Sequence, residues 1–107
     1  MSTQLYDVFV TLGNKERHVL DDQRDYITGN TAPPNTVAYG IGQWDDYKEH
    51  SLFLLYTDVT NTEAQEIKQL TTIAGQQHNQ DAVGCLIVPA NQALINTKPP
   101  TYVYLLE

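Results

Sequence analysis

Basic residues are scarce in this 107-residue chain, with six lysines and arginines against thirteen aspartates and glutamates and a formal net charge of −7. Binding of nucleic acid through its phosphates needs clustered Lys and Arg, so we expect no nucleic-acid partner. No apolar run approaches the roughly 18 residues of a membrane span, and the N-terminal residues lack a signal-peptide pattern, so no membrane partner is expected. The single cysteine, Cys85, cannot form an internal disulfide and has apolar neighbours. It predicts a buried, unreactive thiol in a reducing, cytoplasmic compartment.

Residue types that commonly build catalytic or metal sites are also few. The two serines are Ser2 and Ser51, and Ser51 opens an apolar segment, which argues against a Ser-His-Asp hydrolase. The histidines, His18, His50 and His78, lie far apart, and none has the second His or Cys three or four residues away that zinc sites normally offer. A glycine-rich phosphate loop is absent as well. We therefore expect no catalytic residue set, no metal and no cofactor.

Apolar periodicity predicts the order of strands and helices. Alternating apolar residues indicate half-buried strands, whereas continuous apolar runs indicate central ones. Thr60 and Glu63 form a capping box that starts the second helix, and Gly29-Asn30 predicts a left-handed end for the first. The expected strands are residues 5–12, 36–44, 51–57, 83–88 and 102–106, and the expected helices are residues 20–28 and 60 to about 75.

This β-α-β-β-α-β order with an extra C-terminal strand predicts an α+β, ferredoxin-like fold in a single domain, residues 1–107. Both helices would cover one face of an antiparallel sheet. The third strand is apolar at almost every position, which predicts that the other face is covered too. Either another subunit or the C-terminal segment from Leu94 onward would cover it. We expect self-association into a dimer or a larger homo-oligomer.

Six short steps along residues 5–88 occur in a recognisable order: Phe9 to Gly13, Asp21 to Tyr26, Pro33-Pro34, Gly42-Gln43-Trp44, Glu49-His50-Ser51 and Asp81-Ala82-Val83. This layout resembles a family of small, mostly bacterial proteins known as domain of unknown function 3574. The family's tryptophan in the first helix is absent here. The resemblance implies the same fold and no established activity.

Two groups of residues are candidate ligand-binding sites. On the predicted strand 36–44, Gly40, Gly42 and Trp44 share one face, which would be a flat slot for a planar or peptide ligand, with Tyr39 and Ile41 on the core face. The alternative is that these glycines only allow close packing. The second group is the cluster of cations that an anionic nucleotide would need, Lys15, Arg17, His18 and Arg24.

These features favour a non-catalytic binding or interaction module that acts as a homo-oligomer with a protein or small-molecule partner. A small acidic inhibitor or sequestering protein, acting on another protein or a signalling nucleotide, is an alternative. A further alternative is a cofactor-poor enzyme of the ferredoxin-like dimer type, with Tyr, His or Asp in a cavity between sheet and helices. Unexplained ligand density, or a deep pocket containing His50 or His78, would favour the enzyme.

Overall fold

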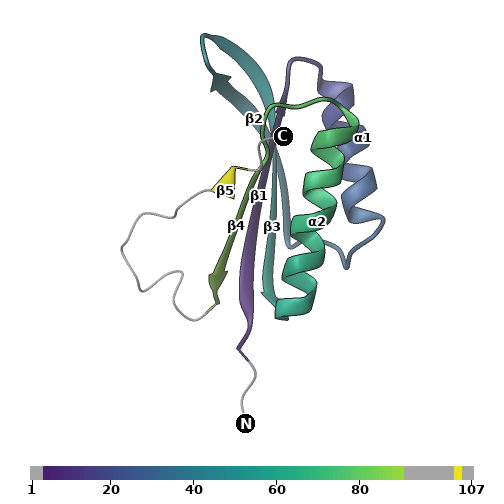
Figure 1. Cartoon of the computed structure of the whole chain (residues 1–107), viewed down its shortest axis with the longest axis vertical. Coiled ribbons are helices and arrows are strands. Elements are labelled where there is room, and N and C mark those ends of the chain that lie inside the picture. Colours follow the sequence, from purple (N-terminus) through teal and green to yellow (C-terminus); the bar gives the residue numbers. More distant parts are fainter. Residues whose placement is uncertain (1–3, 91–102, 105–107) are drawn as a thin grey trace.

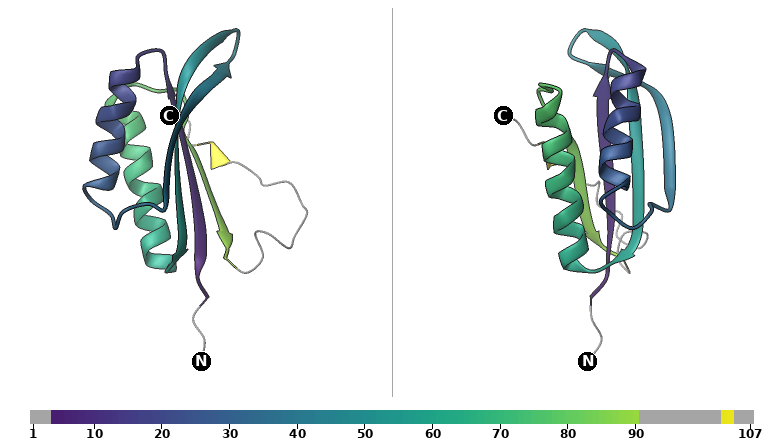
Figure 2. Two further views of the ribbon diagram at one scale, coloured as in Figure 1. Left: turned by 180° about the vertical axis from the view of Figure 1, so that it is seen from behind. Right: turned by 90° about the vertical axis from the view of Figure 1, so that its right-hand side faces the viewer.

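The computed structural model describes residues 4–90 and 103–104. Its elements follow one another as β1 (Tyr6–Asn14), α1 (Arg17–Thr28), β2 (Thr36–Trp44), β3 (Tyr47–Val59), α2 (Asn61–Gln77), β4 (Gly84–Pro89) and β5 (Val103–Tyr104). The strands form one sheet in the order β2-β3-β1-β4-β5, with every neighbouring pair antiparallel. Both helices lie on the same face of this sheet (Figures 1 and 2). The predicted ferredoxin-like α+β fold with an extra C-terminal strand is confirmed.

The hydrophobic core lies between the helices and the two central strands. Alternate residues of β1 point toward the helices, and Val8 and Val10 are fully buried there. The strand register places Val10 beside Leu54 of β3 on one side and Cys85 of β4 on the other. Each fully buried aliphatic side chain contributes about 1.5–3 kcal/mol relative to an exposed one. Helix residues that complete this core are Leu20, Ile27, Ala64, Ile67 and Ala74.

The second helix begins as its sequence predicts. The Thr60 hydroxyl accepts a hydrogen bond from the Glu63 amide (3.2 Å), and the Glu63 carboxylate accepts one from the Thr60 amide (2.9 Å). This capping box satisfies backbone donors that the first turn leaves without helical partners.

The first helix differs from its prediction at both ends. It begins at Arg17 and not at residue 20. The prediction missed this start because the first turn is polar and exposed, which leaves no apolar periodicity to detect. At the other end Gly29 is right-handed (φ −72°), not left-handed. The Asn30 side chain donates to the Tyr26 carbonyl (2.7 Å), so a polar side chain closes the helix where a left-handed glycine was expected.

The outer end of the β2–β3 hairpin bends away from the helices (Figures 1 and 2). Tyr39, lower on β2, is half-buried and packs against the core, as expected. Ile41 was expected on the core face, but it is 68% exposed. The helices do not extend over the hairpin's end, which is why the alternation of β2 fails to predict burial there.

The opposite face of the sheet carries no helix and is nevertheless apolar. Phe9 and Phe53 pack with their ring centroids 6.0 Å apart, and strand alternation directs both to this face. Leu55, Leu86 and Val88 share the face and are half-buried. The segment from Leu94 onward, which was expected to cover it if a subunit does not, lies mostly outside the described residues. Of the predicted strand 102–106, Val103 and Tyr104 are described and pair with β4.

No helix within the described part of the chain has the length and apolarity needed to cross a membrane.

Candidate functional site

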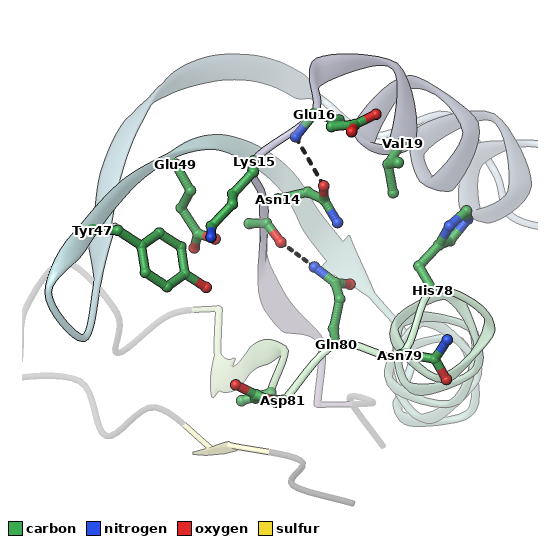
Figure 3. A pocket seen from close by; sticks show the side chains of 12 residues that line it. Asn14, Lys15, Glu16, Val19, Tyr47, Glu49, His78, Asn79, Gln80 and Asp81 are labelled. Carbon is green, nitrogen blue, oxygen red and sulfur yellow. Dashed lines mark hydrogen bonds between the residues drawn. The ribbon is translucent and has the colours of Figure 1, made fainter.

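An open cleft of about 580 Å³ lies at one end of the sheet. Three segments converge on it: the end of β1 with the turn into α1, the start of β3, and the connection from α2 to β4 (Figure 3). A smaller hollow of about 150 Å³ adjoins it. Gly13, Glu49 and Ala82 line both.

Strand register brings these segments together. Gly13 pairs with Ser51 across β1 and β3, and Gly42 pairs with Glu49 across β2 and β3. On the other side of β1, Thr11 pairs with Gly84 of β4. Residues from four strands therefore line one end of the sheet, although they are far apart in the chain, from Thr11 to Gly84.

The Glu49 carboxyl group is the central functional group of the cleft. Its side chain is half-buried and lies against Gly13, where a Cβ atom would overlap the carboxyl. Gly13 has a negative φ, so it is there for this close approach and not for an unusual backbone conformation. Burial raises the pKa of Glu49 above its usual value, and the nearby Lys15 ammonium opposes that rise.

Tyr47 and Lys15 stand beside this carboxyl group. The Lys15 ammonium lies 4.2 Å from the centroid of the Tyr47 ring, within cation–π distance. Burial raises the pKa of the Tyr47 hydroxyl, and the negative charges of Glu49 and Asp81 add to the rise. The aromatic face of Tyr47 thus binds a cation in an acidic surrounding.

A chain of side-chain amides holds the floor of the cleft in place. The Gln80 amide donates to the Gly13 carbonyl (Figure 3). Gln23 of α1, only 1% exposed, donates to the Gln80 carbonyl oxygen (2.5 Å) and to the Ala74 carbonyl (2.9 Å). Both helices are thereby tied to the strand position against which Glu49 rests.

The structure separates the predicted slot residues. Gly42 lines the smaller hollow, where the Ser51 hydroxyl occupies the space that a side chain would need. Gly40 lies under the Phe53 ring, outside both hollows, with room for a Cβ at 3.5 Å from that ring. Trp44 ends β2, and its side chain lies outside the described part of the structure.

The predicted cation cluster is divided between two places. Lys15 lines the cleft. Arg17 stacks on the Tyr39 ring (3.6 Å to the centroid), and Arg24 donates to the Tyr39 hydroxyl (2.6 Å). That hydroxyl donates to Asp21 (2.7 Å), which lowers the pKa of the Asp21 carboxyl. His18 lies 3.4 Å from Glu16 on the exposed first turn of α1.

Reasoning from the sequence missed Glu49 and Gln80 as site residues and considered Tyr47 only as one aromatic wall among several. The sequence signal that could have found Glu49 was the alternation of side chains along a strand, which places Glu49 and Ser51 on the same face of β3. The same face of β2 carries Gly42. His78 also lines the cleft, which is open and not the deep pocket expected for an enzyme, and His50 does not line it.

The cleft combines a half-buried carboxyl group, an aromatic face and further carboxyl groups on Glu16 and Asp81. This set suits an organic cation better than an anion. Among the residues that the structure describes, no group of three His, Cys, Asp or Glu side chains is arranged to hold a metal ion.

No protein-family model matches the chain, and no curated protein matches it. Two solved structures share its fold. One is a phage SAM lyase in complex with S-methyl-5'-thioadenosine, with a TM-score of 0.56 and 11% identity, covering 98% of this chain and 93% of that chain. The other is a phage SAM lyase in the apo state, with a TM-score of 0.57, 10% identity and the same coverage.

These neighbours correct the function expected from the sequence. A non-catalytic binding or interaction module, with an inhibitor or sequestering protein as its alternative, is contradicted, because the structures that share the fold over nearly the whole chain are those of an enzyme.

Proposed function

We propose that this protein is an enzyme that cleaves S-adenosylmethionine and releases S-methyl-5'-thioadenosine. The observation that carries the proposal is the half-buried Glu49 carboxyl group beside the Tyr47 ring in the cleft of about 580 Å³. The likeness of fold to a phage SAM lyase supports the choice of substrate.

The charges of the substrate match those of the cleft. S-adenosylmethionine carries a sulfonium and an ammonium group against one carboxylate, so its net charge is positive. The protein's charge of −7 attracts such a substrate, and the Glu49 carboxyl group offers a place for its cation beside the Tyr47 ring, whose face the Lys15 ammonium takes. Lys15 supplies the positive charge that the substrate's carboxylate needs.

The reaction asks little of acid or base groups. The bond between sulfur and the four-carbon amino-acid chain breaks, and its electron pair passes to the positively charged sulfur, which leaves as a neutral thioether. The carbon chain closes through its own carboxylate oxygen, which displaces the thioether and forms a lactone without any proton transfer. Binding and orientation of the substrate can supply much of the acceleration, on the order of 7–11 kcal/mol for well-oriented groups.

The decisive variant is Glu49→Gln, which keeps the shape of the side chain and removes its charge. Purified protein is incubated with S-adenosylmethionine, and S-methyl-5'-thioadenosine is measured by liquid chromatography. We expect the variant to lose on the order of 100-fold in kcat/KM, as when one charge-stabilising group is removed from an active site. Glu66→Gln, on the exposed surface of α2 outside this cleft, is the matched control and should keep the wild-type rate.

The pH profile gives a second readout of the same group. If ionised Glu49 holds the substrate cation, kcat/KM falls as the pH drops through the raised pKa of this carboxyl group, above the 4.5 of an ordinary glutamate. The acid limb should be absent from Glu49→Gln. Wild-type protein that forms no S-methyl-5'-thioadenosine, or a Glu49→Gln variant with the wild-type rate, would overturn the proposal.

We further propose that the enzyme self-associates through the helix-free face of the sheet. Phe9 and Phe53 form a ring pair there, and the neighbouring apolar side chains are only half-buried. Exposed apolar area of this kind favours association. Light scattering should report at least twice the 12.1 kDa of one chain, and a monomer at micromolar concentration would remove this part of the proposal.

Two expectations from the sequence stay predictions. The cytoplasmic location rests on Cys85, which is a free and buried thiol. Membership of the domain of unknown function 3574 family rests on the short steps along residues 5–88, and conserved Glu and Ser at the positions of Glu49 and Ser51 among its members would support it.

A further inference from the structure

The smaller hollow beside the cleft is built around a hydroxyl group. It is lined by residues of four strands and by Ala82 and Val83 just before β4, and the Glu49 carboxyl group borders it where it meets the larger cleft. Its volume of about 150 Å³ equals that of about five water molecules at about 30 Å³ each, enough for one small ring.

Ser51 is one of the polar residues that line this hollow, with Thr11, Gln43 and Glu49. It is 7% exposed, it lines the hollow, and its hydroxyl makes no hydrogen bond to any other residue that the structure describes. The hydroxyl is open to the hollow, so a molecule bound there can supply the hydrogen-bond partner that the protein does not.

Glycine at position 42 keeps this hydroxyl in place. A Cβ atom on Gly42 would lie 2.5 Å from Ser51 Oγ, too close for both to remain. The residue opposite Ser51 on β1, Gly13, likewise makes room for the Glu49 carboxyl group. The two glycines therefore direct a hydroxyl and a carboxyl oxygen toward one small hollow.

A carboxylate and a hydroxyl side by side recognise the hydroxyl groups of a sugar, because the carboxylate accepts and the serine both donates and accepts. We propose that the smaller hollow takes the ribose hydroxyls of the substrate's nucleoside and that Ser51 determines this specificity. The inference rests on the proposed function. The adenine and the amino-acid chain then extend into the larger cleft.

The test is a thermodynamic cycle in which one hydroxyl of the protein and one hydroxyl of the ligand are removed separately and together. Calorimetry measures the Kd of S-methyl-5'-thioadenosine and of its 2'-deoxy and 3'-deoxy analogues for wild-type protein and for Ser51→Ala. We expect Ser51→Ala to weaken the parent ligand about 2- to 10-fold, the range of one neutral hydrogen bond. It should leave the affinity for one of the deoxy analogues unchanged, because that contact is already missing.

Two further variants separate this contact from general effects. Thr57→Ala removes a hydroxyl from the same face of β3 outside both hollows and should change no affinity. Gly42→Ala displaces the Ser51 hydroxyl and should weaken the parent ligand at least as much as Ser51→Ala does. Thermal melting of each variant confirms that it is folded.

Cleavage of S-adenosylmethionine, measured in parallel, distinguishes the two possible failures. If the wild type cleaves this substrate but Ser51→Ala changes no affinity, or weakens all three ligands equally, the sugar subsite is wrong and the proposed function stands. If the wild type neither cleaves the substrate nor binds the nucleoside, the proposed function is wrong and the subsite with it.

Discussion

Gly13→Ala should reduce activity without reducing stability, because the absence of a side chain at this position leaves room for the Glu49 carboxyl group. Gly13 has a negative φ that alanine adopts without strain, and alanine stabilises such positions by about 0.4–1 kcal/mol through the unfolded state. The new methyl group would overlap the Glu49 carboxyl. That group ends a flexible side chain beside an open cleft, so it can turn away at a cost of about 0.5–1.5 kcal/mol. The free energy of unfolding should thus change by less than about 1 kcal/mol.

The effect on catalysis should be much larger. Displacement of a reacting or binding group by about 1 Å can cost on the order of 100-fold in rate. Urea denaturation measures the stability, and release of S-methyl-5'-thioadenosine measures kcat/KM. Because Gly13 acts through Glu49, the double variant Gly13→Ala/Glu49→Gln should be no slower than Glu49→Gln alone. Losses that multiply, or a Gly13→Ala variant with full activity, would refute this reasoning.

Two further predictions concern the scaffold. Thr60→Ala removes the side-chain cap of α2 and should lower the free energy of unfolding by about 1 kcal/mol in urea denaturation at neutral pH. The Glu63 half of the capping box adds a pH dependence: the Thr60 amide lowers the pKa of Glu63 in the folded state, so its contribution is present above the ordinary 4.5 and is lost as the pH falls through the lowered value. Glu63→Gln should lack this acid-dependent loss. Cys85 is 1% exposed and burial raises its thiol pKa to about 11, so thiol reagents at pH 8 should modify it only at the rate of unfolding. Fast labelling of the native protein would show that β4 opens locally.

The fold could be predicted because its signals are local. The alternation of β1 and the capping box of α2 each lie within a few residues, and both operate in the structure as the sequence indicates. The predicted bounds of β2 are those observed. Predictions failed where a neighbouring element decides the outcome, as at Ile41, which no helix covers, and at Gly29, where the Asn30 side chain closes the helix.

The site could not be predicted in the same way, because its groups come from separate segments. The Glu49 carboxyl group lies against Gly13, and the Gln80 side chain, from the connection between α2 and β4, hydrogen-bonds to the Gly13 carbonyl. None of these three residues belongs to a motif of known chemistry, although Gly13 and Glu49 fall within the short steps along residues 5–88. Gly13, Gly42 and Ser51 are brought together by the register of the strands, and this register cannot be read from the sequence.

The chemistry of the proposed substrate explains why the chain looks poor in catalytic residues. Motif searches look for groups that attack or protonate a stable bond, such as a serine nucleophile or a metal-bound water. A sulfonium compound already contains a positively charged leaving group, so its cleavage needs a cleft that binds a cation and orients the rest of the molecule. A carboxylate, an aromatic ring and one ammonium group suffice for that, and Glu49, Tyr47 and Lys15 provide them side by side. Such residues are common in every protein. What distinguishes them here is that the Glu49 carboxyl group is half-buried against Gly13.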